Sequence, residues 1–335
     1  MTELPLALEY GTAILDLDGC TFHGDTAIEY VPETLEAARA TGIKIFFLTN
    51  NSSRTPEMVA EKLSGLGIPT EPRDIVTSAQ AAAAMVAEQL GAGAKVYAIG
   101  TEAVVTALAE EGLERVESAD DDPVAVLQGL NPKITLTELS EAAIAIQRGA
   151  EYFATNLDPK LPNERGFGVG NGSLVAAVVN TTGVTPTAAG KPEPAIFHLA
   201  AERAGASNPL TVGDQLITDV RGAVAAGMPA LHVLTGVSPA REVILATLQD
   251  RPSHLGLDMR DLLLPYEAAQ PDGEWWACVD AAARVQGSVL ELRGSGRLTD
   301  GQTVTLHEYR ALAAAAWHAA DSGENVSCPD IVVSR

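Results

Sequence analysis

Two aspartates, Asp16 and Asp18, stand in the segment DLDGC directly after a run of apolar residues. Such a run predicts a β-strand, and ligands bind at the carboxyl ends of strands in open α/β sheets. Side chains alternate between the two faces of a strand, so we expect both carboxylates on the same side of the backbone. Two carboxylates this close favour a divalent cation or a shared proton between them. For this motif taken alone, a solvated Asp-Gly turn is the alternative.

A polar cluster, LTNNSSRTP, follows a second predicted strand and precedes a predicted helix. Thr49 offers a hydroxyl group there, and the amides around Asn50 and Asn51 lie ahead of a helix N-terminus, where a phosphate group binds well. A helix-capping turn is the alternative. Lys191, in the segment AGKPEP, adds a cation before a helix that Pro194 can start. A lone lysine in such a position is usually solvated.

The segment GDQLITD supplies a third acidic site, with Asp214 after a predicted strand and Asp219 in the next turn. Asp214 could complete an all-oxygen metal site with Asp16. Each of these signals is weak alone. Their common placement at strand ends, in the order DxDG, T-N, K, GDxxxxD, makes a purely structural explanation of all four improbable.

Short apolar runs alternate with helical patterns along the chain, which predicts an α/β fold with a parallel sheet. Pro32 and Pro56 stand where first helical turns would begin, the latter behind a capping Thr55, and Gly42 and Gly67 stand where helices would end. We expect strands near residues 12–18, 44–49, 210–213 and 230–234, and helices near 32–41 and 56–66.

A second set of alternations interrupts this pattern, which resumes at Ala188. An interruption of this length indicates a small domain inserted into a core made of two separated segments. We expect its strands near residues 95–99, 124–128 and 152–155 and its helices near 79–90, 102–111 and 136–148. The predicted division is a core of residues 1–78 and 183–264, an inserted domain of 79–182, and a C-terminal unit of 265–335 with a hairpin near 293–300 and a helix near 306–320.

Composition narrows the class of protein. The chain has 335 residues, and 44 acidic against 22 basic residues give a net charge of −22. This charge disfavours nucleic acid and anionic membranes as partners. The N-terminal segment lacks a signal-peptide pattern, and no stretch is long and apolar enough to span a membrane. Three widely spaced cysteines make no disulfide framework, so we expect a cytoplasmic protein.

The four motifs, in this order, resemble those of the haloacid dehalogenase superfamily of phosphatases, in particular the branch of NagD and 4-nitrophenylphosphatase proteins. The resemblance covers roughly residues 6–264 and includes ATNLDPKLPNERGFGVGNGSLVAA, which is similar to the branch's cap signature. It implies a Rossmann-like core with an inserted α/β cap, here followed by a small α+β extension. Gln215 and Ile217 depart from the family's usual Arg and Asp, which removes two polar groups beside the third acidic motif.

The resemblance also implies roles for the acidic residues. The family counterpart of Asp16 is the nucleophile, and that of Asp18 is the general acid and base. Asp16, the backbone carbonyl of Asp18 and Asp214 would bind Mg²⁺, with Asp219 supporting these ligands from beside them.

Further roles follow from the same resemblance. The phosphoryl oxygens would be held by Thr49, Asn50 and Lys191. Three residues would face the leaving group and select the substrate: Asn156, Asp158 and His23. For His23, a plain surface histidine is the alternative. The four glycines between residues 166 and 172 predict a loop first and a substrate lid second.

The expected function is Mg²⁺-dependent hydrolysis of a small phosphate ester through an aspartyl-phosphate. Glycerol 3-phosphate is the leading substrate. This chain has an extra C-terminal segment, and members of the branch with such a segment look most like the branch's glycerol-phosphate phosphatases. The alternatives are phosphoglycolate, a nucleoside monophosphate or pyridoxal phosphate as substrate, or a non-catalytic sensor of a phosphorylated metabolite. A receiver-type signalling domain is disfavoured, since it carries its phosphate-accepting aspartate on a later strand. The cap commonly mediates dimerisation in this branch, which implies a possible homodimer.

Overall fold

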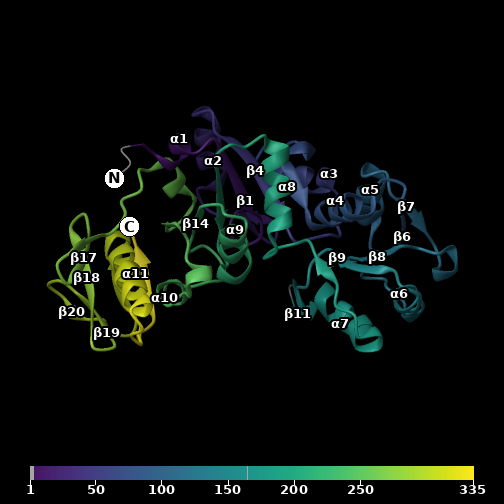
Figure 1. The fold of residues 1–335 in the computed structure, drawn as a ribbon. Helices are drawn as coiled ribbons and strands as arrows, with labels where there is room; N and C mark the ends of the chain where they lie inside the picture. The colour runs from purple at the N-terminus through teal and green to yellow at the C-terminus, as the bar shows by residue number, and fades with distance from the viewer. Residues whose placement is uncertain (1–3, 164) are drawn as a thin grey trace. The chain divides into compact units, whose positions relative to one another are not determined.

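The structure is a computed structural model that describes residues 4–163 and 165–335. Parallel strands alternate with helices along much of the described chain, which confirms the predicted α/β class (Figure 1). The chain forms two compact units, each assembled from separated stretches. The first unit comprises Met1–Phe46, Leu66–Ile68 and Ala204–Arg335, and the second comprises Phe47–Gly65 and Pro69–Arg203.

The first unit contains a parallel sheet in which β1 lies between β13 and β4, with β14 and then β15 beyond β13. Leu15 pairs with Val212, and Gly213 pairs with His232, so the carboxyl ends of β1, β13 and β14 are neighbours. The strands are β1 (Thr12–Asp16), β4 (Lys44–Thr49), β13 (Pro209–Gly213), β14 (Ala230–His232) and β15 (His254–Leu255).

These strands form because their apolar residues are consecutive. Ala13, Ile14 and Leu15 are all buried, as expected for a strand with both faces covered. The surrounding helices are α1 (Leu6–Glu9), α2 (Val31–Ala40), α9 (Arg221–Ala225) and α10 (Ala240–Ile244), with short helical turns at Leu216–Val220, Leu248–Asp250 and Met259–Leu263 and a hairpin of β2 (Phe22–His23) and β3 (Thr26–Ala27).

Two predicted strands of this sheet are shorter than expected. The strand predicted at residues 12–18 ends at Asp16, because the backbone turns there: the amides of Thr21 and Phe22 both donate to the carbonyl oxygen of Leu17. Asp18 therefore lies in a turn, and the argument from strand alternation does not apply to it. The strand predicted at 230–234 ends at His232.

The second unit contains the end of β4 paired with β5, and a parallel sheet in the order β12, β9, β8, β6, β7. Apolar residues of this sheet, among them Tyr97 and Val126, pack against Ala142 and Ile146 of α6. The strands are β5 (Ile75–Thr77), β6 (Lys95–Ile99), β7 (Glu114–Val116), β8 (Ala125–Gln128), β9 (Glu151–Ala154), β10 (Lys160–Asn163), β11 (Gly166–Val169) and β12 (Thr187–Ala188). The helices are α3 (Pro56–Gly65), α4 (Ser78–Leu90), α5 (Glu102–Glu110), α6 (Leu136–Gln147), α7 (Asn171–Thr182) and α8 (Pro194–Ala204), with short turns at Pro72–Asp74 and Ala119–Asp121.

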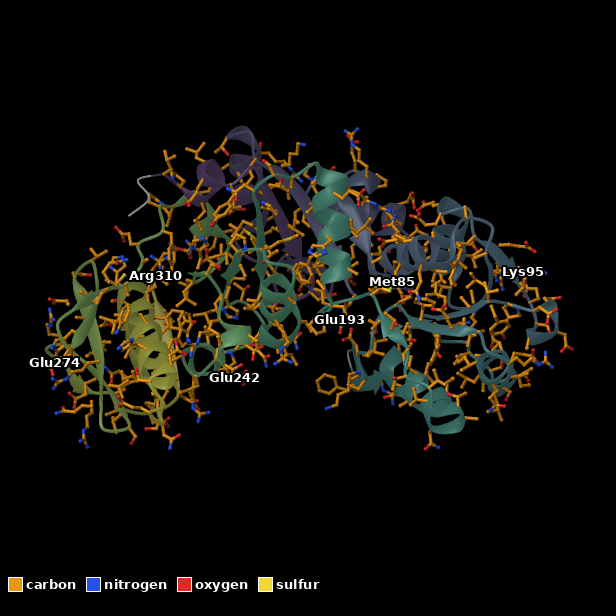
Figure 2. The ribbon with its side chains drawn as sticks, viewed as in Figure 1. Met85, Lys95, Glu193, Glu242, Glu274 and Arg310 are labelled. Atoms are coloured by element: carbon orange, nitrogen blue, oxygen red, sulfur yellow. The ribbon has the colours of Figure 1, made fainter. Side chains whose placement is uncertain are left out.

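The C-terminal part of the first unit is an antiparallel sheet with α11 (Leu306–Asp321) beside it (Figure 1). The predicted hairpin is present, since β19 pairs with β20 across a short turn. Arg310 lies on α11 (Figure 2), and its Nε donates to the carbonyl oxygen of Leu255 (3.0 Å). Trp317 donates to the carbonyl oxygen of Val243 (3.1 Å), so this part is anchored within its unit. Its strands are β16 (Gln270–Asp272), β17 (Trp275–Cys278), β18 (Ala281–Gln286), β19 (Val289–Leu292), β20 (Gly296–Arg297), β21 (Gln302–Thr305) and β22 (Ile331–Ser334).

The described helices include none that combines the length and the apolar character needed to cross a membrane.

Candidate active site

Three carboxylates converge in the first unit. Asp16, Asp214 and Asp219 each place one carboxylate oxygen within 4.8 Å of the others. Asp214 and Asp219 are only 1% and 5% exposed. Like charges this close and this buried repel one another unless a cation lies among them. Carboxylate oxygens are ligands that Mg²⁺ prefers, so the donor set fits a hard divalent cation.

Asp214 is held by the loop that follows β14. Its Oδ2 accepts a hydrogen bond from the amide of Val237 (2.7 Å), and its backbone carbonyl accepts from the amide of Ser238 (3.1 Å). Two glycines leave room for its carboxylate. A Cβ on Gly19 would lie 2.6 Å from Oδ2, and one on Gly236 would lie 1.9 Å from it. The carboxylate thus occupies space that any other residue at these two positions would fill.

His232 supports Asp214 from the end of β14. Its Nε2 is 2.9 Å from the carbonyl oxygen of Asp214, and since a carbonyl can only accept, Nε2 carries the proton. Burial lowers the pKa of His232 to about 4, so the ring is neutral at pH 7. The sequence showed only a histidine without ligand spacing. Its position at the end of an apolar strand was the one signal that pointed to this edge.

Asp219 lies close to the other two carboxylates. One of its oxygens belongs to the cluster, and its predicted role beside the metal ligands stays a prediction. Its Oδ2 also accepts from the amide of Gln215 (3.0 Å), which closes the turn after β13. Gln215 accepts from the hydroxyl of Thr218 (3.0 Å), and Ile217 is 55% exposed. With Gln215 and Ile217 at these positions, the turn is therefore still held by hydrogen bonds among its own residues.

Asp18 and His23 belong to the chain that leaves β1. Asp18 is exposed in the turn, and Gly19 after it has a φ of +91°, a conformation that favours glycine. The hydroxyl of Thr21 donates to the carbonyl oxygen of Asp16 (2.6 Å) and fixes the start of the turn. His23 is exposed on β2, and its Nε2 is 2.9 Å from the carbonyl oxygen of Thr235.

In the second unit, the polar cluster after β4 forms a turn fixed by its own side chains. Thr49 is buried, and its hydroxyl accepts from the amide of Asn51 (3.1 Å). Asn51 accepts in turn from the amide of Ser53 (2.8 Å). The hydroxyl of Thr55 accepts from the amide of Met58 (3.4 Å), which confirms it as the cap of α3. The cluster therefore forms a capping turn, one of the two predicted alternatives, and phosphate binding by its amides stays a prediction.

Asn50 joins several predicted site residues of the second unit. Its Nδ2 donates to Asp158 (3.0 Å) and to the carbonyl oxygen of Lys191 (3.0 Å), and its Oδ1 accepts from the amide of Lys191 (2.7 Å). Its own carbonyl accepts from the side chains of Ser78 (2.6 Å) and Asn156 (2.7 Å). Lys191 is buried, whereas a lone lysine in such a position is usually solvated. The side chains of Asn50, Asn156 and Asp158 are thus committed, at least in part, to holding one another.

The prediction of a glycine-rich loop between residues 166 and 172 is wrong. Residues Gly166–Val169 form β11, and α7 begins at Asn171. A Cβ on Gly170 would lie 2.2 Å from the carbonyl oxygen of Asp158, and one on Gly172 would lie 2.1 Å from that of Leu157. These two glycines allow close backbone packing in place of loop freedom.

Comparison with known proteins agrees with this arrangement. A family model for haloacid dehalogenase-like hydrolases matches residues 13–114, and a second, described as HAD-hydrolase-like, matches residues 188–262. The D-glycerol 3-phosphate phosphatase of Mycobacterium tuberculosis is 40% identical over 316 residues, which are 94% of this chain and 88% of that protein.

Solved structures show the same likeness. The crystal structure of a glycerol phosphate phosphatase from Mycobacterium tuberculosis in complex with magnesium has a TM-score of 0.85 and 38% identity, over 99% of this chain and 96% of that one. The 4-nitrophenylphosphatase from Thermotoga maritima has a TM-score of 0.70 and 27% identity, over 77% and 98% of the two chains. The chain belongs to the haloacid dehalogenase-like hydrolase family, as its motifs predicted, with relatives of the 4-nitrophenylphosphatase type.

Proposed function

We propose that this protein is a Mg²⁺-dependent phosphatase that hydrolyses glycerol 3-phosphate. The observation that carries the proposal is the cluster of Asp16, Asp214 and Asp219 at the neighbouring ends of β1 and β13. The choice of substrate rests on the relative of 40% identity that is named a D-glycerol 3-phosphate phosphatase and that spans nearly all of this chain.

The residues of the cluster fit the metal. Asp16, the backbone carbonyl of Asp18, and Asp214 are proposed as its ligands, and the place of Asp219 in the cluster makes it a further candidate. When bound, Mg²⁺ would neutralise part of the charge on the carboxylates and on the phosphoryl oxygens.

Asp16 is the proposed nucleophile. Its carboxylate oxygen attacks phosphorus as the bond to the ester oxygen breaks, which forms an aspartyl-phosphate and divides one difficult step into two easier ones. Asp18, exposed in the turn two residues later, gives its proton to the departing alkoxide. It then accepts a proton from the water that attacks phosphorus, and the bond to Asp16 breaks to release inorganic phosphate. Proton transfer by a positioned group typically contributes about 10²- to 10⁴-fold.

Thr49, Asn50 and Lys191 are proposed to hold the phosphoryl oxygens. Phosphoryl transfer needs hydrogen-bond donors and positive charge around the peripheral oxygens more than it needs covalent chemistry. The side chain of Asn50 already bonds Asp158 and Lys191, so we assign its backbone amide to the phosphate and its side chain to positioning.

We propose that Asn156, Asp158 and His23 select the substrate. Asn156 and Asp158, which are both bonded to Asn50, are proposed to contact a hydroxyl group of the substrate, and His23 would contribute its second ring nitrogen. Small hydrogen-bonding groups of this kind suit a polyol better than a flat ring.

We also propose the division into a core of residues 1–78 and 183–264, a cap of 79–182 and an extension of 265–335. The parallel sheet of β6 to β9 supports a separate cap, although its outer strand β12 lies at Thr187–Ala188, beyond the proposed boundary. The antiparallel sheet with α11 supports a distinct extension.

A homodimer and a cytoplasmic location complete the proposal. The dimer rests on the family resemblance alone, and light scattering after gel filtration tests it. The location is supported by Cys20, Cys278 and Cys328, which are buried thiols outside any disulfide. Cell fractionation tests the location.

Steady-state release of inorganic phosphate tests the function. The purified protein with Mg²⁺ is assayed against glycerol 3-phosphate, phosphoglycolate, a nucleoside monophosphate and pyridoxal phosphate. We expect the highest kcat/KM for glycerol 3-phosphate. A hundredfold preference for one of the others would refute the substrate and leave a phosphatase, whereas binding without turnover of any ester would indicate the sensor.

A further inference from the structure

One loop of the first unit contacts both acidic segments. It runs between β14 and α10, at residues 233–239. The hydroxyl of Thr235 donates to the carbonyl oxygen of Gly19 (2.8 Å), directly after Asp18. Two residues further on, the amide of Val237 donates to the carboxylate of Asp214 (2.7 Å). The loop therefore links the turn after β1 to the carboxylate after β13.

The bond to Gly19 fixes a peptide group of the acidic turn. Gly19 also donates from its amide to the carbonyl oxygen of Phe22 (3.0 Å). Since the amide of Gly19 and the carbonyl of Asp18 belong to one planar peptide, bonds on both sides of the Gly19 Cα set the direction of the Asp18 carbonyl. That carbonyl is a proposed metal ligand, so its direction bears directly on metal affinity.

Hydrogen bonds, more than apolar packing, hold the tip of this loop. Gly236 has no side chain and is exposed, and Val237 is 64% exposed. Thr235 is half-buried, and besides its hydroxyl bond its carbonyl oxygen pairs with His23 (2.9 Å). Loss of the Thr235 hydroxyl would remove the bond between the loop and Gly19, two residues before the Val237 amide that holds Asp214.

We propose that Thr235 is a positioning residue that sets the affinity for Mg²⁺. Its hydroxyl fixes the Asp18–Gly19 turn relative to the loop that carries the Val237 amide. The Asp18 carbonyl and the Asp214 carboxylate then face the same ion. This inference rests on the proposed metal-dependent function. Residues that orient metal ligands in this indirect way typically change metal affinity by about 10- to 100-fold when they are replaced.

The test is calorimetric titration of the apo protein with Mg²⁺ alone. Thr235→Val keeps the shape of the side chain and removes the hydroxyl, and Thr235→Ser restores it. We expect the Kd for Mg²⁺ to rise at least about tenfold in the valine variant and to stay within about twofold of wild type in the serine variant. At saturating Mg²⁺, kcat of the valine variant should recover toward wild type, which a merely unfolded fraction would not do.

Thr41→Val is the matched control. Its hydroxyl also donates to backbone carbonyls of the first unit, those of Ala7 (3.1 Å) and Ala38 (2.7 Å), and neither residue belongs to the acidic segments. The Thr41→Val substitution should lower Tm without changing the Kd for Mg²⁺.

If Thr235→Val does not fold, Thr235→Ala takes its place. A valine or alanine variant that binds Mg²⁺ as wild type does overturns the role of Thr235, whereas a wild-type protein that binds no Mg²⁺ overturns the proposed function itself.

Discussion

Gly236→Ala is the sharpest test of how the acidic cluster is built. The added Cβ would lie 1.9 Å from Oδ2 of Asp214, whereas real Cβ atoms essentially never come within 3.0 Å of a heavy atom outside their own residue and its chain neighbours. The carboxylate or the loop must therefore move by roughly 1 Å. Misplacing a reacting group by this much costs about 10²-fold in rate, or about 2.7 kcal/mol of transition-state stabilisation.

The assay compares kcat for glycerol 3-phosphate and the Kd for Mg²⁺ in Gly236→Ala and Gly11→Ala. Gly11 is the matched control, because a Cβ there meets nothing within 4 Å and its φ lies outside the left-handed region. We expect kcat to fall about a hundredfold and Mg²⁺ binding to weaken only in the first variant, with circular dichroism unchanged in both. A Gly236→Ala protein with more than a tenth of wild-type kcat and unchanged Mg²⁺ affinity would show that Asp214 does not need its present position.

Four further predictions follow from the same structure. Asp16→Asn should keep a native circular dichroism spectrum and lose all but a few per cent of kcat, because it removes the nucleophile and keeps its shape. EDTA should stop phosphate release, Mg²⁺ should restore it, and Ca²⁺ should inhibit, since its flexible coordination spoils in-line geometry. Burial holds the pKa of His232 and of His254 at about 4, below the ordinary 6.5, so the unfolded state binds more protons between these values. Urea unfolding in EDTA should show stability falling as pH drops from 6.5 to 4, by on the order of 3 kcal/mol for His232 alone. Arg310→Met should lower Tm and leave kcat unchanged, because it frees α11 from the carbonyl of Leu255 without touching the acidic cluster.

The central strands of both parallel sheets were predictable from the sequence, because most of them are short apolar runs. Short edge strands such as β5, β7 and β15 were not predicted. The strands expected at residues 44–49 and 95–99 have those bounds in the structure. The hairpin of β10 and β11 was missed, since glycine-rich sequence favours a loop when its packing partners are unknown. Gly170 and Gly172 show the reason: they are small to let α7 start against residues 157–159.

The acidic site was predictable only in part. Asp16 ends one apolar strand and Asp214 follows another, and the topology of a parallel sheet places such strand ends at one edge. The residues that hold them carry no local signal. Thr235 bonds Gly19 across 216 positions of sequence, and His232 bonds a backbone carbonyl that any residue could supply. Contacts of this kind depend on the strand order and register, which a single sequence does not specify.

The two explanations that the sequence left open for the cluster after β4 are compatible. The side chains of Asn51 and Thr55 cap and close the turn, as a structural turn requires. A turn fixed by its own side chains holds its backbone amides in place before any ligand binds, so little entropy is lost when an anion arrives. The bonds from Asn50 to Asp158 and Lys191 extend this rigidity to the residues proposed for the substrate. The capping bonds would thus hold the backbone amides of this turn in place for a phosphate group.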